Sequence, residues 1–249
     1  MKSVTASKLV SVKSWFDKPE KYLSRRQFDI RIRTETVDHF TKHHTFDHVL
    51  DIGCGDGSLS LPVLPRSRRI TLLDVSASML DIARSRIPAD RLQDVDLFNV
   101  NFMDSKLEPE SYDLILCVGV LAHVDSPADV ITEIERIARP GAVVILEFTD
   151  GYHPWGLVDA IYRKTLKMFR PIPLDVNRLK HRDLKSLCRR KGLRPVGLYR
   201  YGIPPAGTRW IADQNQMYLM TRFLFGPSNE NRNAWMGNEF IYCLEKCPS

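Results

Sequence analysis

Residues 49–57, VLDIGCGDG, are the stretch that decides the fold of this chain. The apolar start of the stretch ends in Asp51, and glycines follow at the alternate positions Gly53, Gly55 and Gly57. This pattern is typical of a buried parallel strand that runs into a tight glycine turn. Glycine is needed there because it adopts backbone angles closed to other residues and lets the main chain approach a ligand closely. The stretch therefore predicts a strand and a turn that together bind a ligand.

A second apolar run, residues 70–75, follows about twenty positions later and carries Asp74 near its end. An acidic residue at this distance from a glycine turn is the usual acceptor for ribose hydroxyls in a nucleotide site. The glycines are spaced G-x-G-x-G, whereas a dinucleotide site needs G-x-G-x-x-G for its pyrophosphate. The strand, the turn, Asp51 and Asp74 together indicate a nucleotide-type ligand that is not a dinucleotide, and they disfavour a turn without a ligand.

At residues 51–57, DIGCGDG, the chain resembles the class I S-adenosylmethionine-dependent methyltransferases, of the type that acts on small molecules. The resemblance covers residues 45–150 and includes the stretch 119–124 after the fourth apolar run and the Arg-Pro-Gly at 139–141 before the fifth. It implies S-adenosyl-L-methionine as the cofactor and S-adenosyl-L-homocysteine as its product.

Strands and helices alternate along the chain, which predicts an α/β protein with a doubly wound, mostly parallel sheet. The resemblance implies a Rossmann-like sheet of seven strands, with N-terminal helices and a C-terminal lid or insertion. The final strand alternates as an edge strand should, and it is expected to pair antiparallel in a closing hairpin. Beyond residues 49–57 and 70–75, strands are expected at residues 96–102, 112–118, 142–148, 193–201 and 240–244. Helices are expected at residues 17–44, with one or two breaks, and at 58–63, 76–87, 126–138, 155–169, 176–191 and 213–225.

The elements predict one domain in three parts. Residues 1–44 form a tail and helices that cover the cofactor, and residues 45–150 form the core that binds S-adenosylmethionine. Residues 151–249 supply a lid helix, an insertion and the closing strands that complete the same domain. The length of 249 residues and the apolar share of 43% suit a soluble globular protein of this size.

The predicted cofactor site lies at the carboxyl ends of the strands, where doubly wound sheets bind their ligands. Asn101 stands where family members often have an Asp for the adenine amino group, with Asp104 three positions later, so which of the two faces adenine stays open. Met79 either packs on adenine or belongs to the core. Tyr22 and Arg33 either reach the cofactor carboxylate or an acidic substrate, or lie on a solvated helix face. The predicted cofactor-binding residues are Tyr22, Arg33, Asp51, Gly53, Cys54, Gly55, Gly57, Asp74, Val75, Met79, Asn101, Phe102, Met103, Cys117, Val118 and Gly119.

Three residues are candidates for catalysis. His123 follows the fourth strand, and an ordinary histidine pKa of about 6.5 suits proton removal near neutral pH. The alternative is that His123 is structural or only lines the site. Tyr152 and His153, which follow the fifth strand, are weaker candidates.

Five scattered cysteines lack the spacing of a zinc site, which predicts reduced thiols, a cytoplasmic protein and no structural metal. The start of the chain has no long apolar core, so no signal peptide is expected. No apolar run reaches the roughly 18 residues of a membrane span.

The net charge of +6 is concentrated in residues 163–209, with 14 Lys or Arg and two Asp. A solvated face, an anionic substrate, nucleic acid or an acidic membrane surface would each explain this excess. Residues 155–169 form a basic amphipathic pattern, for which a lid is favoured over contact with a membrane surface. The oligomeric state is not indicated.

We therefore predict a methyltransferase that moves a methyl group from S-adenosylmethionine to an oxygen or nitrogen of a small metabolite, anionic or aromatic. The alternatives are an RNA methyltransferase and a catalytically silent binding protein on the same fold. Nucleic acid is not favoured, because Cys117-Val118-Gly119-Val120 follows the fourth strand in place of a base-flipping signature such as Asn-Pro-Pro-Tyr.

Overall fold

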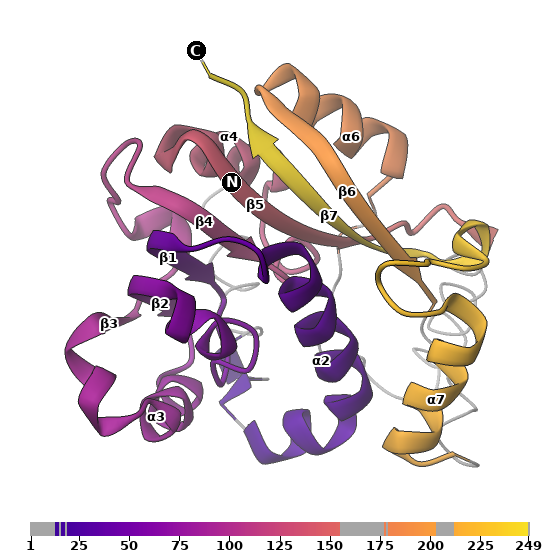
Figure 1. Ribbon diagram of the computed structural model, residues 1–249, viewed down its shortest axis with the longest axis horizontal. Helices are drawn as coiled ribbons and strands as arrows, with labels where there is room; N and C mark the ends of the chain where they lie inside the picture. The colour runs from indigo at the N-terminus through magenta and orange to yellow at the C-terminus, as the bar shows by residue number, and fades with distance from the viewer. Residues whose placement is uncertain are drawn as a thin grey trace.

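The computed structural model describes residues 13–14, 16–17, 19–154, 177, 179–202 and 212–248. In this part of the chain, the strands form one sheet of seven in the order β3-β2-β1-β4-β5-β7-β6 (Figure 1). All neighbours are parallel except β7, which runs antiparallel to both β5 and β6. The strands are β1 (Phe46–Ile52), β2 (Ser67–Asp74), β3 (Val95–Asn99), β4 (Tyr112–Cys117), β5 (Ala138–Thr149), β6 (Leu193–Tyr201) and β7 (Glu239–Lys246). This sheet confirms the predicted fold class.

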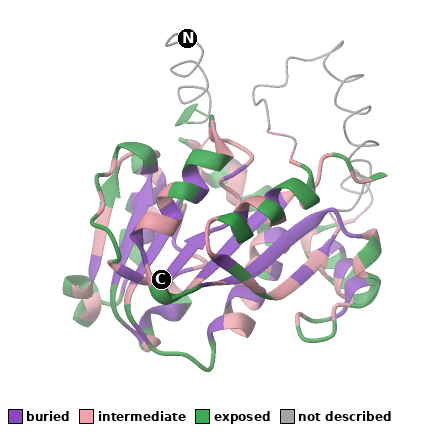
Figure 2. Cartoon of the chain, turned by 90° about the horizontal axis from the view of Figure 1, so that it is seen from above, coloured by how far each residue is buried: buried purple, intermediate pink, exposed green. Residues whose placement is uncertain are grey.

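Helices cover both faces of the sheet. One face packs against α2 (Pro19–Thr41), α3 (Ala77–Arg86), α7 (Gln214–Phe225) and the short 3-10 helix η1 (Leu61–Arg66). The other packs against α4 (Pro127–Ile137), α6 (His181–Arg190) and η3 (Phe102–Asp104). Two further 3-10 turns are η2 (Ala89–Asp94) and η5 (Ala234–Met236). The result is a three-layer sandwich whose central strands are buried on both faces (Figure 2).

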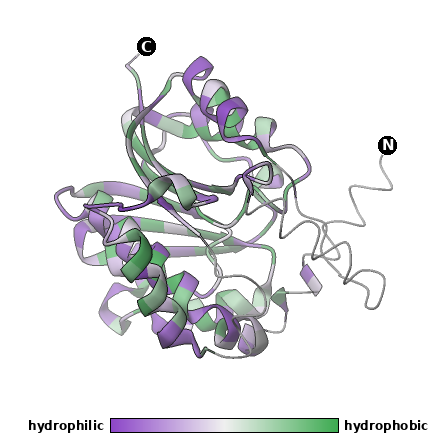
Figure 3. Cartoon of the chain, turned by 90° about the vertical axis from the view of Figure 1, so that its right-hand side faces the viewer, coloured by the Kyte–Doolittle hydropathy of each residue, from purple (hydrophilic) through white to green (hydrophobic). Residues whose placement is uncertain are grey.

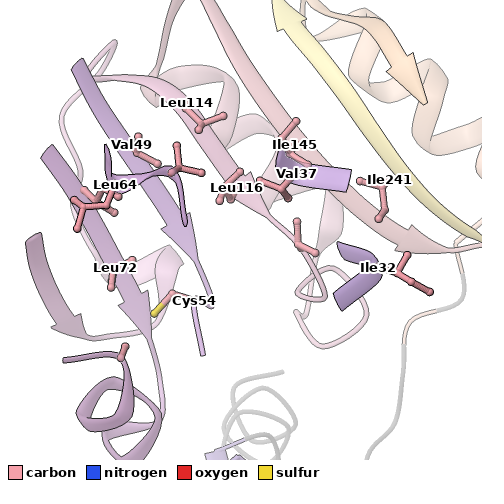
Figure 4. Packing of buried hydrophobic residues seen from close by; sticks show 14 of the residues in the cluster. Ile32, Val37, Val49, Cys54, Leu64, Leu72, Leu114, Leu116, Ile145 and Ile241 are labelled. Atoms are coloured by element: carbon pink, nitrogen blue, oxygen red, sulfur yellow. The ribbon is translucent and has the colours of Figure 1, made fainter. Parts of the chain in front are cut away.

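The core on the α2 face shows why these segments fold together. Ile32 and Val37 of α2 pack against Val49, Leu114 and Ile145 of the central strands (Figure 4). Green hydrophobic positions follow the strands, and purple hydrophilic positions appear along the outer helices in Figure 3. Each fully buried aliphatic side chain of this kind stabilises the fold by roughly 1.5–3 kcal/mol.

Helix starts are set by capping residues that the sequence supplies. The Ser76 side chain accepts a hydrogen bond from the backbone of Met79 at the start of α3, and Ser126 accepts one from Asp129 at the start of α4. Asp213 and Gln216 form a reciprocal capping box at the start of α7. These contacts satisfy backbone N–H groups that have no partner within the helix.

Several predicted elements differ from those observed. The crossover helix predicted at residues 58–63 is wrong: turns and η1 connect β1 to β2, because Pro62 and Pro65 remove two backbone donors that an α-helix needs. The helix predicted with breaks over residues 17–44 is one continuous helix, α2. β3 ends at Asn99, before η3, and β5 already begins at Ala138.

The prediction that the last strand lies at the sheet edge is also wrong. β7 lies between β5 and β6, and β6 is the edge strand. Most β7 side chains are buried, because both of its sheet faces are covered. The lid helix predicted at residues 155–169 lies outside the described residues, and the three-part division of the domain stays a prediction. Among the described helices, none combines the length and the apolar character that crossing a membrane requires.

Candidate functional site

A cavity of about 500 Å³ opens at the carboxyl ends of the parallel strands. Its wall is built from the ends of β1, β2 and β4, the loops that follow β3 and β4, and the first turns of α3 and α4. The order of the strands reverses between β1 and β4, and doubly wound sheets bind ligands at this kind of switch point. Twelve of the predicted site residues line it: Tyr22, Gly53, Gly55, Asp74, Val75, Met79, Asn101, Phe102, Met103, Val118, Gly119 and His123.

The glycine turn brings main chain to the cavity wall. Gly55 has a φ of +55°, and a Cβ built on it would meet no atom within 4 Å. Gly53 has a φ of +66°, and its Cβ would lie 2.7 Å from Cγ2 of Val120. At Gly55 only the positive φ disfavours a side chain, whereas at Gly53 a side chain would also collide with Val120. Both glycines line the cavity, so their backbone forms that part of its wall.

Asp74 connects the end of β2 to this turn. Its Oδ2 accepts a hydrogen bond from Gly55 N at 2.8 Å, and its Oδ1 accepts one from Ser76 N at 2.8 Å. Burial raises the pKa of Asp74, although these backbone donors partly oppose the shift. A carboxylate oxygen has more than one lone pair, so Asp74 still offers acceptor capacity to a ligand hydroxyl in the cavity.

Asp51 lies beneath the turn and does not line the cavity. Burial raises the pKa of Asp51 to about 7, the nearby carboxylates of Asp74 and Asp56 add to the rise, and the Ser60 hydroxyl offsets only part of it. Asp51 therefore holds its proton more tightly than an ordinary aspartate, because burial disfavours its charged form.

The adenine end predicted around residue 101 forms one continuous wall. Asn101 donates from Nδ2 to Oδ2 of Asp104 at 3.0 Å, and both residues line the cavity together with Phe102 and Met103. Met79 is buried and also lines the cavity. Asn101 and Asp104 therefore form one hydrogen-bonded pair in this wall.

The N-terminal segment covers the cavity. The ring of Phe16 lies edge-on to Tyr22, with 4.9 Å between centroids, and edge-on to His123 at 5.9 Å. The Ser76 hydroxyl lies 2.9 Å from Oδ1 of Asp17, which fixes this segment to the start of α3. Sequence reasoning did not identify Phe16, because nothing in its local pattern indicates a partner more than a hundred residues away.

The charge of the cavity wall is acidic. Among the described residues, the lining includes Asp74, Asp104, Asp125 and Asp129 but no Lys or Arg. The rest of the lining is largely apolar or uncharged. This wall suits a cationic or neutral ligand better than an anion.

Comparison with known proteins identifies the family. Residues 50–144 match the family model described as "Methyltransferase domain". Residues 50–144 therefore form a domain of the methyltransferase family. S-adenosylmethionine is the methyl donor of this family, and the Asp74 carboxylate, the backbone of the glycine turn and the acidic lining of the cavity fit that molecule.

Two curated relatives of this methyltransferase share a name. It is 33% identical over 99 residues to "Ubiquinone biosynthesis O-methyltransferase" of Dechloromonas aromatica (strain RCB), covering 39% of this chain and 42% of the relative. It is 35% identical over 95 residues to the protein of that name from Hahella chejuensis (strain KCTC 2396), covering 38% of this chain and 40% of the relative. The match therefore spans about two fifths of each relative's length.

Solved structures match almost the whole methyltransferase. A possible histamine N-methyltransferase from Thermotoga maritima has a TM-score of 0.65 at 16% identity, covering 96% of this chain and 99% of that one. Magnesium protoporphyrin IX methyltransferase from Synechocystis, with bound S-adenosylhomocysteine, has a TM-score of 0.63 at 16% identity and the same coverage. At these identities the likeness concerns the fold.

Four further predicted cofactor residues lie outside the cavity lining of this methyltransferase. Cys54 and Cys117 are buried, and burial raises the pKa of both thiols. Gly57 packs against Leu61 behind the turn, and Arg33 lies in a buried cluster of charges. Their roles toward the cofactor stay predictions.

The two weaker catalytic candidates are separate from His123. Tyr152 is 51% exposed, and Nζ of Lys180 lies 4.8 Å from its ring centroid. His153 Nε2 lies 3.0 Å from the backbone oxygen of Trp235. Neither residue lines the cavity, whereas His123 does.

Sequence reasoning also missed the far wall of the cavity. Asp125, Ser126, Asp129 and Val130, at the start of α4, line it. The available signal was the Ser126 helix start directly after the stretch 119–124, because a helix that begins at a strand end points its first turn toward the ligand crevice. In the described part of the chain, no group of three or more side chains could hold a metal ion.

Proposed function

We propose that this protein transfers the methyl group of S-adenosylmethionine to an oxygen of a small molecule. The observation that carries the proposal is the cavity at the switch point of the sheet. There Asp74 accepts a hydrogen bond from Gly55 of the glycine turn. Transfer to oxygen is supported by the similarity to two O-methyltransferases, over the two fifths of their length that match.

In this reaction the protein binds the methyl donor, orients the acceptor oxygen and accepts a proton. S-adenosylmethionine supplies an electrophilic methyl group on a sulfonium. Gly53, Gly55 and Asp74 would bind it so that an acceptor oxygen is held in line, with the reacting atoms about 3–3.5 Å apart. His123 lines the same cavity and would accept the proton that the hydroxyl loses.

We further propose a neutral acceptor with an aromatic or apolar face. Phe16, Val120, Val124 and Val130 supply apolar wall, and the four aspartates disfavour an anion. Of the anionic and aromatic substrates that the sequence predicts, this lining favours the aromatic ones. Six of the 14 basic residues in 163–209 lie outside the described residues, and the other eight lie between Lys180 and Arg200. The five cysteines are free thiols, which supports a reducing compartment such as the cytoplasm.

Two experiments test the proposal in sequence. Calorimetric titration of the purified protein with S-adenosylhomocysteine should show binding at micromolar to low millimolar ligand, and no binding would overturn the proposal. Methyl transfer from labelled S-adenosylmethionine should then be measured for a panel of phenols and catechols, with primary amines and aromatic carboxylic acids as comparison classes. Product from amines alone would refute transfer to oxygen.

A further inference from the structure

Helix α7 turns its charged and hydroxyl side chains toward the protein. Tyr218 donates from its hydroxyl to Oε1 of Glu35 on α2 at 2.9 Å, and Arg222 donates from Nη2 to Oε2 of the same carboxylate. Nη1 of Arg222 also donates to the hydroxyl of Tyr199 on β6 at 2.9 Å. Arg222 is the one charged residue between Gln214 and Phe225. The helix therefore uses its charge to hold itself on α2 and β6.

The outward face of α7 is apolar. Leu219 and Phe223 are four positions apart, as are Met220 and Leu224, so the four side chains share one face of the helix. All four are exposed, and Phe223 is 83% exposed. A surface helix usually has the opposite pattern, with apolar residues toward the core and charged residues toward solvent. This face is therefore better suited to contact with another apolar surface than to contact with water.

Trp235 extends the apolar face beyond the end of the helix. Asn233 Nδ2 donates to the backbone oxygen of Leu224 at 2.8 Å, which fixes η5 to the last turn of α7. Trp235, in η5, is 73% exposed. Figure 1 shows α7 beside α2, at the rim of the molecule. We call the following residues the α7 ridge: Leu219, Met220, Phe223, Leu224 and Trp235.

The area of the α7 ridge is large for a monomer. Phe223 and Trp235 together expose roughly 350 Å², taking about 200–250 Å² for each side chain when fully exposed. The three aliphatic residues bring the ridge to roughly 600 Å², the upper end for the largest apolar patch of a typical monomer. Two such ridges in contact would bury about 1,200 Å², which is where stable protein interfaces begin.

The charges around the α7 ridge favour a protein surface over an anionic lipid surface. Residues 212–236 contain two acidic and two basic residues, Asp213, Glu230, Arg222 and Arg232. Arg222 points inward, and Arg232 pairs with Glu230 at 2.5 Å. Helices that lie on membranes carry an excess of Lys and Arg beside their apolar face. In the described chain, the basic excess instead lies on and beside α6, which covers the opposite face of the sheet.

We infer that the α7 ridge is the two-fold interface of a homodimer. A two-fold contact brings the same surface of both protomers together, so an apolar ridge meets an equally apolar ridge. The ridge itself carries no charge, and its burial therefore neither opposes like charges nor leaves a charge unpaired. None of the ridge residues lines the cavity. The dimer and the proposed function are therefore independent.

Sedimentation equilibrium of the purified protein measures this association. Over about 1–100 μM the wild type should form dimers, with a dissociation constant no weaker than about 10 μM. Phe223→Glu places a carboxylate in both copies of the ridge. It should weaken the dimer by about thirtyfold or more, as for the loss of an aromatic anchor at the centre of an interface. Because Phe223 is exposed in the monomer, the variant should unfold at the same temperature as the monomeric wild type.

Phe98→Glu is the matched control. Phe98 is also an exposed phenylalanine, but it lies on β3, at the opposite edge of the sheet from β6. This variant should leave the dissociation constant unchanged. Crosslinking then locates the interface without a charged substitution. In a Cys247→Ser background, which removes the exposed cysteine, a short bismaleimide should link Met220→Cys protomers but not Leu92→Cys protomers.

Each result supports or overturns the dimer. A wild type that stays monomeric up to about 100 μM overturns it, and so does a dimer that persists in Phe223→Glu. Vesicles of phosphatidylcholine and phosphatidylglycerol test the other occupant: a monomer that binds them through Phe223 would assign the ridge to lipid and overturn the dimer. If Phe223→Glu does not fold, crosslinking at Met220→Cys alone supports the interface, and equal crosslinking at Leu92→Cys overturns it. Titration with S-adenosylhomocysteine tests the proposed function separately in every case.

Discussion

Asp74 Oδ2 accepts a hydrogen bond from the backbone N–H of Gly55, with 2.8 Å between the heavy atoms. The two residues follow different strands, and the parallel pairing of Ile52 with Leu73 brings those strand ends together. The side chain that would bind ribose therefore also holds the turn that would contact the rest of the donor. Loss of the Asp74 carboxylate should therefore affect both the stability of the turn and the binding of the donor.

This coupling predicts two effects of Asp74→Ala. The variant removes the acceptor for Gly55 N and Ser76 N, so we expect a loss of about 2 kcal/mol in the free energy of unfolding. Calorimetry should also show S-adenosylhomocysteine binding about tenfold or more weaker. Asp90→Ala, at an exposed position, is the control and should change neither quantity. Unchanged affinity of Asp74→Ala would show that the ribose binds elsewhere.

Substitutions at two glycines with positive φ distinguish the effect of backbone strain on stability from the effect of ligand contact on affinity. Gly55 and Gly141 have φ values of +55° and +78°, and a Cβ on either would meet no atom within 4 Å. Each Gly→Ala change should therefore cost about 1–2 kcal/mol of stability, measured by urea unfolding. Only Gly55 lines the cavity, so only Gly55→Ala should weaken S-adenosylhomocysteine. Equal affinity in both variants would contradict a ligand close to the Gly55 backbone.

His123→Gln should separate catalysis from donor binding. If His123 accepts the acceptor's proton, methyl transfer should fall by about 10²–10⁴, while S-adenosylhomocysteine affinity changes less than about threefold. His153→Gln is the control, because His153 lies outside the cavity lining. The acceptor for this assay is the best substrate of the phenol panel. Full activity in His123→Gln would leave His123 as a wall residue.

Substitution of Lys246 should lower the free energy of unfolding without changing the affinity for S-adenosylhomocysteine. This residue is 7% exposed, and its Nζ donates to the backbone oxygens of Glu135 and Ala138 at 2.8 and 2.9 Å, at the end of α4. Lys246→Met leaves these carbonyls without their donor, so the free energy of unfolding should fall by about 1–3 kcal/mol. Lys42→Met, at an exposed position, should be neutral. S-adenosylhomocysteine affinity should not change in either variant.

Buried acids should make the protein less stable as pH rises. Burial raises the pKa of Asp51 to about 7 and that of Glu239 to about 8; Asp74 and Asp56 add to the first rise, and Glu147 and Asp29 add to the second. The native state therefore binds these protons more tightly than the unfolded state, whose pKa values are near 4. Their contribution to stability is complete below about pH 4 and is lost as pH rises through 7 and 8.

Urea unfolding between pH 5 and 8.5 measures this slope. Each group should contribute a decline of up to about 1.4 kcal/mol per pH unit inside its window. Asp51→Asn and Glu239→Gln should flatten the curve, each in its own range. A slope that is the same in wild type and variants would mean that neither group is protonated at neutral pH.

Much of the site was predictable because its signals are local. The strand, the glycine spacing and Asp74 each follow from hydrophobic period and turn chemistry within a few residues. The strand order then places these ends in one crevice, and twelve predicted residues line it. The helix predicted at 58–63 is wrong for a local reason as well, because Pro62 and Pro65 lack the backbone N–H groups that an α-helix needs.

The sequence by itself determined the alternation of strands and helices, the glycine turn and the kind of ligand it binds, because these depend on neighbouring residues. Only the tertiary structure decided that β7 is an inner strand, that Phe16 lies against His123, and that Arg33 pairs with Glu147 across 114 positions. The physical reason is that such contacts depend on strand order, register and helix packing. Each of these features is decided by the free-energy difference between whole arrangements of the chain. No single stretch of sequence contains that information.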